Sequence, residues 1–140
     1  MLDRIFSEHL AHNRYQNGRL PVTYADFENV GVQRKYIRSS IDELVALGLV
    51  EETFTGRKRF GDLPGRPSLY RITWIGTISQ KGGTSPPTDE WRSIQTSEQA
   101  EERVKSAKEM RSQKNSTALV KRRNVGCQRS TTDRLSNDNH

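Results

Sequence analysis

The segment from Gly31 to Gly48 constrains the fold of this chain more than any other. Apolar residues recur in it at i, i+4, i+7 and i+8, the spacing of one face of an α-helix. This stripe consists of Ile37, Ile41, Leu44 and Val45. Gly48 follows where a glycine commonly ends a helix in the left-handed conformation. The sequence therefore predicts an amphipathic helix that buries its stripe in a small core.

The opposite face of this helix is basic and polar, above all at its N-terminal end. Five side chains there are candidates to face the major groove of DNA: Gln33, Arg34, Lys35, Arg38 and Ser39. Cations suit phosphate groups, and arginine and lysine can form paired hydrogen bonds with guanine. A solvated amphipathic helix without a partner would show the same pattern, so the neighbouring segments have to decide between these interpretations.

Three elements are predicted ahead of this helix. Residues 2–14 carry a one-sided apolar stripe and predict a helix. Residues 20–22 are extended, and Pro21 restricts them to a sheet edge or to the start of a strand. Thr23 and Asp26 have the spacing of a capping box and predict a short helix that ends in a glycine turn. Two helices joined by such a turn form a helix-turn-helix arrangement.

Beyond Gly48 the apolar pattern changes from a helical to an extended period. Residues 49–54 begin one strand, and residues 68–74 alternate along a clearer second strand. The thirteen residues between them, 55–67, exceed the ~2–5 of an ordinary hairpin loop and predict a long, functional loop. Its cations are expected to contact phosphate groups or the minor groove. They are Arg57, Lys58, Arg59 and Arg66.

This order of elements resembles that of small bacterial winged helix-turn-helix proteins of the transcription-regulator type. The resemblance covers residues 15–75 and is carried by residues 18–27, 41–51 and 66–73. The middle stretch is similar to their "L-x-x-L-G-hydrophobic-hydrophobic-E" junction between recognition helix and wing. The resemblance implies an α+β fold of three helices and a small antiparallel sheet with a wing hairpin. It also implies a DNA-facing surface, but no target sequence, effector or ligand pocket.

The aromatic residues divide the chain into a folded part and a polar remainder. Nine of the ten lie between Phe6 and Trp74, and the last is Trp91. Only 31% of all residues are hydrophobic, well below the roughly 45–50% of typical globular domains. We therefore expect a winged helix-turn-helix domain over residues 1–78 and little core beyond it.

The remainder is predicted to be a linker, a helix and a tail. Residues 79–95 have the composition of a linker, within which Trp91 either docks onto the domain or faces a partner. Residues 96–114 predict a solvated helix, because Thr96 and Gln99 have capping-box spacing but few apolar residues follow. Residues 115–140 lack aromatic residues and predict a disordered basic tail.

The charge and composition exclude several classes of function. A net charge of +6 favours nucleic acid or an anionic membrane as partner, but no apolar run is long enough to span a bilayer. We expect no disulfide, because Cys127 is the only cysteine, and no metal site, because His9 and His12 lack a third ligand. No nucleophile–base arrangement or phosphate-cradling glycine loop emerges. We therefore expect a cytoplasmic protein without cofactor, small-molecule ligand or enzymatic activity.

These observations favour sequence-specific binding of double-stranded DNA in transcriptional regulation. Plasmid or phage replication initiation through the same domain is an alternative. A winged-helix module for protein–protein interaction, docking through the Trp91 segment and residues 97–113, is another. One winged helix makes few base contacts, so a homodimer or contacts from the tail would be needed for tight, specific binding.

Overall fold

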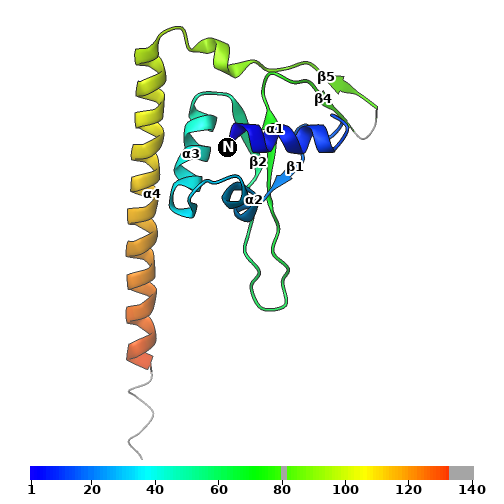
Figure 1. The fold of residues 1–140 in the computed structure, drawn as a ribbon. Helices are drawn as coiled ribbons and strands as arrows, with labels where there is room; N and C mark the ends of the chain where they lie inside the picture. The colour runs from blue at the N-terminus through cyan, green and yellow to red at the C-terminus, as the bar shows by residue number, and fades with distance from the viewer. Residues whose placement is uncertain (80–81, 133–140) are drawn as a thin grey trace, which may run out of the picture.

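The computed structural model describes residues 1–79 and 82–132, with side chains as far as residue 117. The first part of the chain folds into three helices against a three-stranded antiparallel sheet (Figure 1). The helices are α1 (Leu2–Ala11), α2 (Tyr24–Asn29) and α3 (Arg34–Ala46). The strands are β1 (Leu20–Val22), β2 (Val50–Phe54) and β3 (Ser68–Ile72), in the order β1-β3-β2. The predicted α+β class is confirmed, and α1 ends at Ala11 rather than at residue 14.

The core of this part lies between the helices and the sheet. Each of the three helices and three strands contributes to it, and its fully buried apolar residues are Ile5, Leu20, Val22, Phe27, Ile37, Ile41, Val50, Tyr70 and Ile72. Of the predicted stripe, Ile37 and Ile41 are buried and Leu44 packs against the core. Val45 remains 41% exposed because it faces a groove beside a later helix.

The predicted start of α2 is confirmed in detail. The backbone N–H of Asp26 donates to Thr23 Oγ1 over 3.2 Å, and the backbone N–H of Thr23 donates to Asp26 Oδ2 over 2.7 Å. The Thr23 hydroxyl also donates to this carboxylate, which holds the pKa of Asp26 below its usual value. Pro21 lies in an edge strand, as its missing N–H requires.

Asn17 supports the sheet in a way that the sequence did not indicate. Its side chain is buried, donates to the carbonyls of Ile72 and Ile75 over 2.9 and 2.7 Å, and accepts from the N–H of Ile72 over 2.7 Å. The sequence marks Asn17 and Gly18 only as a turn. Because the amide joins the α1–β1 connection to the end of β3, its role depends on contacts between distant segments.

Residues 55–67 form the thirteen-residue connection between β2 and β3 that the sequence predicts, but the connection is an ordered ribbon rather than an irregular loop. A register shift between Glu52 and Phe54 is followed by isolated bridges that pair Arg57 with Arg66 and Phe60 with Leu63. The turn itself is only Gly61-Asp62, with Gly61 at φ +55°. We call residues 55–67 the basic hairpin.

The segment predicted to be a linker, residues 79–95, is docked onto the folded part where it is described. Strands β4 (Thr77–Ile78) and β5 (Thr84–Ser85) pair with each other, and the short 3-10 helix η1 (Glu90–Ser93) follows. The backbone N–H groups of Thr88 and Asp89 both donate to the carbonyl of Thr73, over 3.0 and 3.1 Å. Trp91 is 39% exposed, so the segment docks but leaves part of this ring accessible.

Helix α4 (Ser97–Thr132) is longer than predicted. Its start is confirmed, since Gln99 N–H donates to Thr96 Oγ1 over 3.3 Å. Residues 115–132 are helical rather than disordered; they contain no proline, which would interrupt a helix. The rest of the predicted tail, residues 133–140, lies outside the described residues. Within the described ranges, no helix combines the length and apolarity needed to cross a membrane.

Candidate nucleic-acid interface

The N-terminal end of α3 presents three of the predicted site residues to solvent. Gln33 is the N-cap residue, and Arg34 and Lys35 follow it, all three exposed. Arg34 forms an ion pair with Glu28 over 2.8 Å. Lys35 lies over the ring of Tyr36 at 4.7 Å from its centroid and has no acidic partner in the described part of the chain. Lys35 is therefore the cation of this helix end that is free to meet an anion.

Arg38, predicted to reach a base edge, is bound to two carboxylates of the protein itself. Its Nη2 lies 2.8 Å from Asp42 Oδ1, and its Nη1 lies 2.9 Å from Glu52 Oε2 on β2. Burial disfavours the charged guanidinium, but the Glu52 hydrogen bond and the two negative charges outweigh this and raise the pKa of Arg38. Arg38 thus ties α3 to β2. Ser39 likewise donates to the carbonyl of Tyr36, over 2.9 Å.

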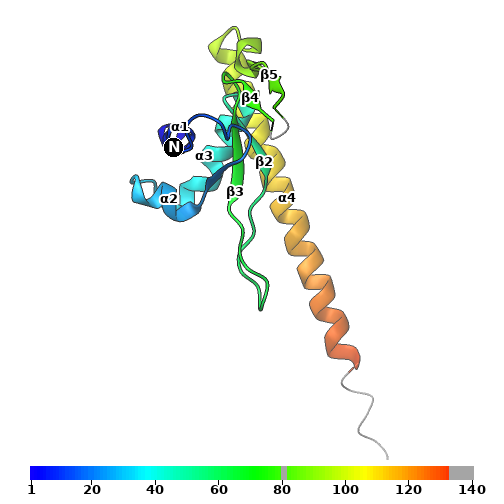
Figure 2. The same ribbon diagram turned by 90° about the vertical axis from the view of Figure 1, so that its right-hand side faces the viewer.

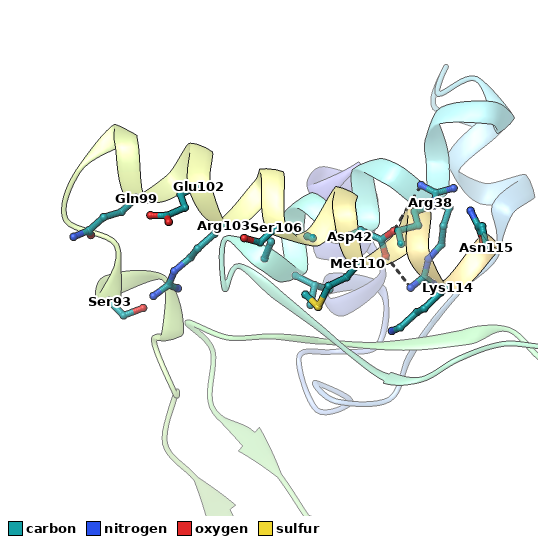
Figure 3. Close-up of a pocket in the computed structure, with 14 residues that line it drawn as sticks. Arg38, Asp42, Ser93, Gln99, Glu102, Arg103, Ser106, Met110, Lys114 and Asn115 are labelled. Carbon is teal, nitrogen blue, oxygen red and sulfur yellow. Dashed lines mark ion pairs between the residues drawn. The ribbon is translucent and has the colours of Figure 1, made fainter. Parts of the chain in front are cut away.

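Helix α4 packs along α3 with one face (Figure 3), while the other side chains described on it are exposed, as predicted. The partly buried positions of α4 lie three or four residues apart on one face of the helix: Ala100, Val104, Ala107 and Arg111. Lys108 Nζ lies 3.0 Å from Glu43 Oε1, and Arg111 Nη1 lies 3.6 Å from Asp42 Oδ2. The sequence missed this packing because a stripe of two alanines and one valine is too weak to predict it.

The four cations of the basic hairpin have a different environment. Arg57, Lys58, Arg59 and Arg66 are all exposed. None of them forms an ion pair with an acid of residues 1–79 or 82–117. The hairpin itself contains a single acid, Asp62, at its turn. The hairpin is therefore a strip of unneutralised positive charge.

The basic hairpin and the N-terminal end of α3 lie on the same side of the molecule. In Figures 1 and 2 the hairpin projects downward beyond α1, α2, α3 and the sheet, and the turn that leads from α2 into α3 lies on that lower side. The second half of α4 projects in the same direction. The exposed N-terminal end of α3 and the basic hairpin thus lie on one side of the molecule, whereas the side chains of Arg38 and Ser39 are bound to groups within the protein.

Other parts of the described chain offer less to a ligand. His9 is 2% exposed, and its burial, assisted by the charge of Arg14, lowers its pKa. No group of three metal-binding side chains occurs among the described residues. A groove of about 990 Å³ runs between α3 and α4, and its walls mix both signs of charge with apolar residues (Figure 3).

Sequence reasoning assigned no role to Phe60, the most exposed large apolar residue of the described chain at 83%. An aromatic residue directly after three cations and before a glycine was the signal that could have drawn attention to it.

Comparison with known proteins identified no relative: no family model matches the chain, and neither does any curated protein or solved structure.

Proposed function

We propose that this chain binds double-stranded DNA as a winged helix-turn-helix protein, with transcriptional regulation as its role. One observation carries the proposal. Four hairpin cations without acidic partners in the described chain project on the same side as the exposed N-terminal end of α3. A duplex is a polyanion, and neutralising its phosphates with lysine and arginine is the main source of affinity for DNA.

The order of the elements supports this proposal. The succession α1, β1, α2, α3, β2, β3, with β1 and β2 on either side of β3, is that expected of a winged helix-turn-helix domain. In such a domain α3 would be the recognition helix and the basic hairpin the wing. Fold alone does not determine function, so the proposal depends on the unpaired cations.

The contacts within the protein divide the roles among the site residues. Gln33 and Lys35 are exposed and could reach base edges, where glutamine suits adenine and lysine suits guanine. Arg57, Lys58, Arg59 and Arg66 would follow the phosphate backbone. Arg38 would instead act within the fold, by holding α3 against β2.

A salt series of duplex affinities tests the proposal. Replacing Arg57, Lys58 and Arg59 with glutamine should weaken binding to every sequence. It should also reduce the slope of log K against log salt by about 0.9 for each phosphate that the variant no longer neutralises. The matched control replaces Arg14, Arg19 and Lys105, three exposed cations outside α3 and the hairpin, and should change the slope much less.

Two results would reject or narrow the proposal. If the unmodified chain shows no salt-dependent affinity for duplexes, an interaction module becomes the better interpretation. If it binds, selection of duplexes from a random library would reveal the target, and a palindromic target would indicate a homodimer. Regulators and replication initiators would share this surface, so the location of the selected target would separate these two roles.

A further inference from the structure

Two large apolar residues flank the Gly61-Asp62 turn at the tip of the basic hairpin, although the hairpin is surrounded by solvent. Phe60 is 83% exposed and Leu63 is 54% exposed. The two residues face each other across the turn, because Phe60 N–H donates to the Leu63 carbonyl over 3.1 Å and Leu63 N–H donates back over 3.0 Å. They therefore form one apolar point at the end of the ribbon, remote from the core.

This tip is held in place before any partner arrives. The Arg57 and Arg66 backbones exchange hydrogen bonds of 2.9 and 2.8 Å further down the ribbon. At Gly56 the opposite strand comes so close that a Cβ would lie 2.5 Å from the backbone nitrogen of Ser68. A two-residue turn with Gly61 at positive φ closes the end. An ordered ribbon loses little conformational entropy on insertion into a partner.

The charge around the tip indicates what the partner is. The exposed cations Arg57, Lys58, Arg59 and Arg66 suit a strongly anionic surface, whereas exposed Phe60 and Leu63 suit an apolar interior directly beneath it. A DNA duplex combines these two properties, with phosphates outside and stacked bases inside. Architectural proteins insert apolar side chains between base steps from the minor groove and kink the duplex in this way.

We propose that Phe60, backed by Leu63, is a wedge that enters the minor groove and partly unstacks one base step. This inference rests on the proposed DNA binding and adds a deformation of the duplex to it. Flexible pyrimidine–purine steps unstack at the lowest cost, so the wedge favours TA and CA/TG steps at a position where no base edge is read. The hairpin thereby contributes to specificity through the shape of the DNA as well as to affinity through charge.

The test uses the full chain and a duplex that carries 2-aminopurine in its TA steps, with a donor and acceptor dye at its two ends. Binding should raise the 2-aminopurine fluorescence, which reports unstacking, and bring the dyes closer together. Phe60→Ala should abolish both changes and weaken binding about tenfold, with an unchanged salt slope because no cation is removed. Phe60→Leu should retain part of each signal.

Tyr15→Ala is the matched control, since Tyr15 is also an exposed aromatic residue, at 63%, but lies outside the hairpin. It should leave both signals intact. Unchanged fluorescence and bending in Phe60→Ala would overturn the wedge and leave DNA binding standing, whereas a chain that binds no duplex would overturn both proposals. If Phe60→Ala leaves both DNA signals unchanged but no longer binds vesicles of phosphatidylserine and phosphatidylcholine, the tip contacts a membrane and the wedge is overturned.

Discussion

Helix α3 and the basic hairpin look alike in sequence, because each presents a cluster of cations, but the fold uses these cations differently. On α3, Arg34 is paired with Glu28, and Arg38 is held by Asp42 and Glu52. On the hairpin, none of the four cations meets an acid of the described chain. A basic segment therefore offers a partner only the charges that its own fold leaves unpaired.

The difference follows from where the two elements lie. Helix α3 is enclosed by α2, β2 and α4, and these elements bring carboxylates or cations within reach of its polar face. The hairpin extends beyond the body of the molecule, where no other element of the first 79 residues accompanies it (Figure 2). Four predictions test this contrast, in order of decreasing effect.

Ile41→Asp should unfold the domain, so that neither the ion pairs of α3 nor the ordered hairpin remains. Ile41 is 1% exposed on α3. An unpaired buried carboxylate costs several kcal/mol, out of a total stability of about 5–15 kcal/mol for a domain. Thermal melts followed by circular dichroism measure the effect. Val30→Asp, at a position that is 52% exposed, is the control and should melt close to the unmodified chain. A melt of Ile41→Asp unchanged within a degree or two would show that the stripe is not core.

Arg38→Ala should destabilise the fold more than it weakens DNA binding. The substitution leaves the carboxylates of Asp42 and Glu52 without their shared cation, which we expect to cost about 1–3 kcal/mol. Urea unfolding measures this loss. Lys35→Ala, one turn earlier, should show the opposite pattern, with normal stability and weaker binding to the preferred duplex. The expectation is wrong if Arg38→Ala keeps full stability but discriminates less at one base pair. The Arg38 guanidinium would then contact a base edge in the complex instead of Asp42 and Glu52.

A stop codon after Gln95 should leave a folded domain that is only slightly less stable. The truncation removes the Lys108–Glu43 and Arg111–Asp42 pairs, which are partly exposed and together contribute about 1 kcal/mol. It also removes more cations than acids, so duplex affinity and the salt slope should fall on all sequences. The double variant Lys108→Gln and Arg111→Gln separates the effect of packing from that of charge. Tighter binding after truncation would instead show that α4 shields α3 from DNA.

The smallest expected effect is a dependence of folding stability on pH. It arises from a buried histidine of the folded part, His9, and involves no charge of the hairpin. Burial lowers the pKa of His9 in the folded state. The unfolded chain therefore binds more protons than the folded one just below the ordinary histidine pKa of about 6.5. The contribution of neutral His9 to the free energy of unfolding is therefore fully present above the unfolded pKa, and it is lost as the pH falls through the lower pKa of the folded state. His9→Leu should flatten the dependence of the urea midpoint between about pH 7 and about pH 5. An unchanged slope would assign the dependence to another group.

A large part of the fold was predictable because it follows from local patterns. The stripe on α3, the capping box of Thr23 and Asp26, the edge position of Pro21 and the extended period after Gly48 each involve residues close together in the chain. Helical and extended periodicities state which face of an element is buried without knowledge of its partner. The positions of the hairpin cations were visible in the sequence for the same reason.

The order of the hairpin was not predictable because it depends on pairing across the sheet. The register of β2 and β3 shifts between Glu52 and Phe54, and the bridges that pair Arg57 with Arg66 and Phe60 with Leu63 follow beyond this shift. The sequence shows only a glycine-rich polar stretch there, which is equally typical of a loop. An ordered ribbon and a mobile loop contain the same residues, and long-range strand pairing decides between them.

Local sequence patterns specify which elements form, where most of them begin, and that cations gather on α3 and between β2 and β3. Which of these cations are neutralised depends instead on how the elements pack in three dimensions. Arg38 meets Glu52, fourteen residues away along the chain, and Asp42 meets Arg111 from a helix that the sequence left solvated. Propensity and periodicity act over a few residues, whereas an ion pair depends on the distance between side chains that the whole fold brings together.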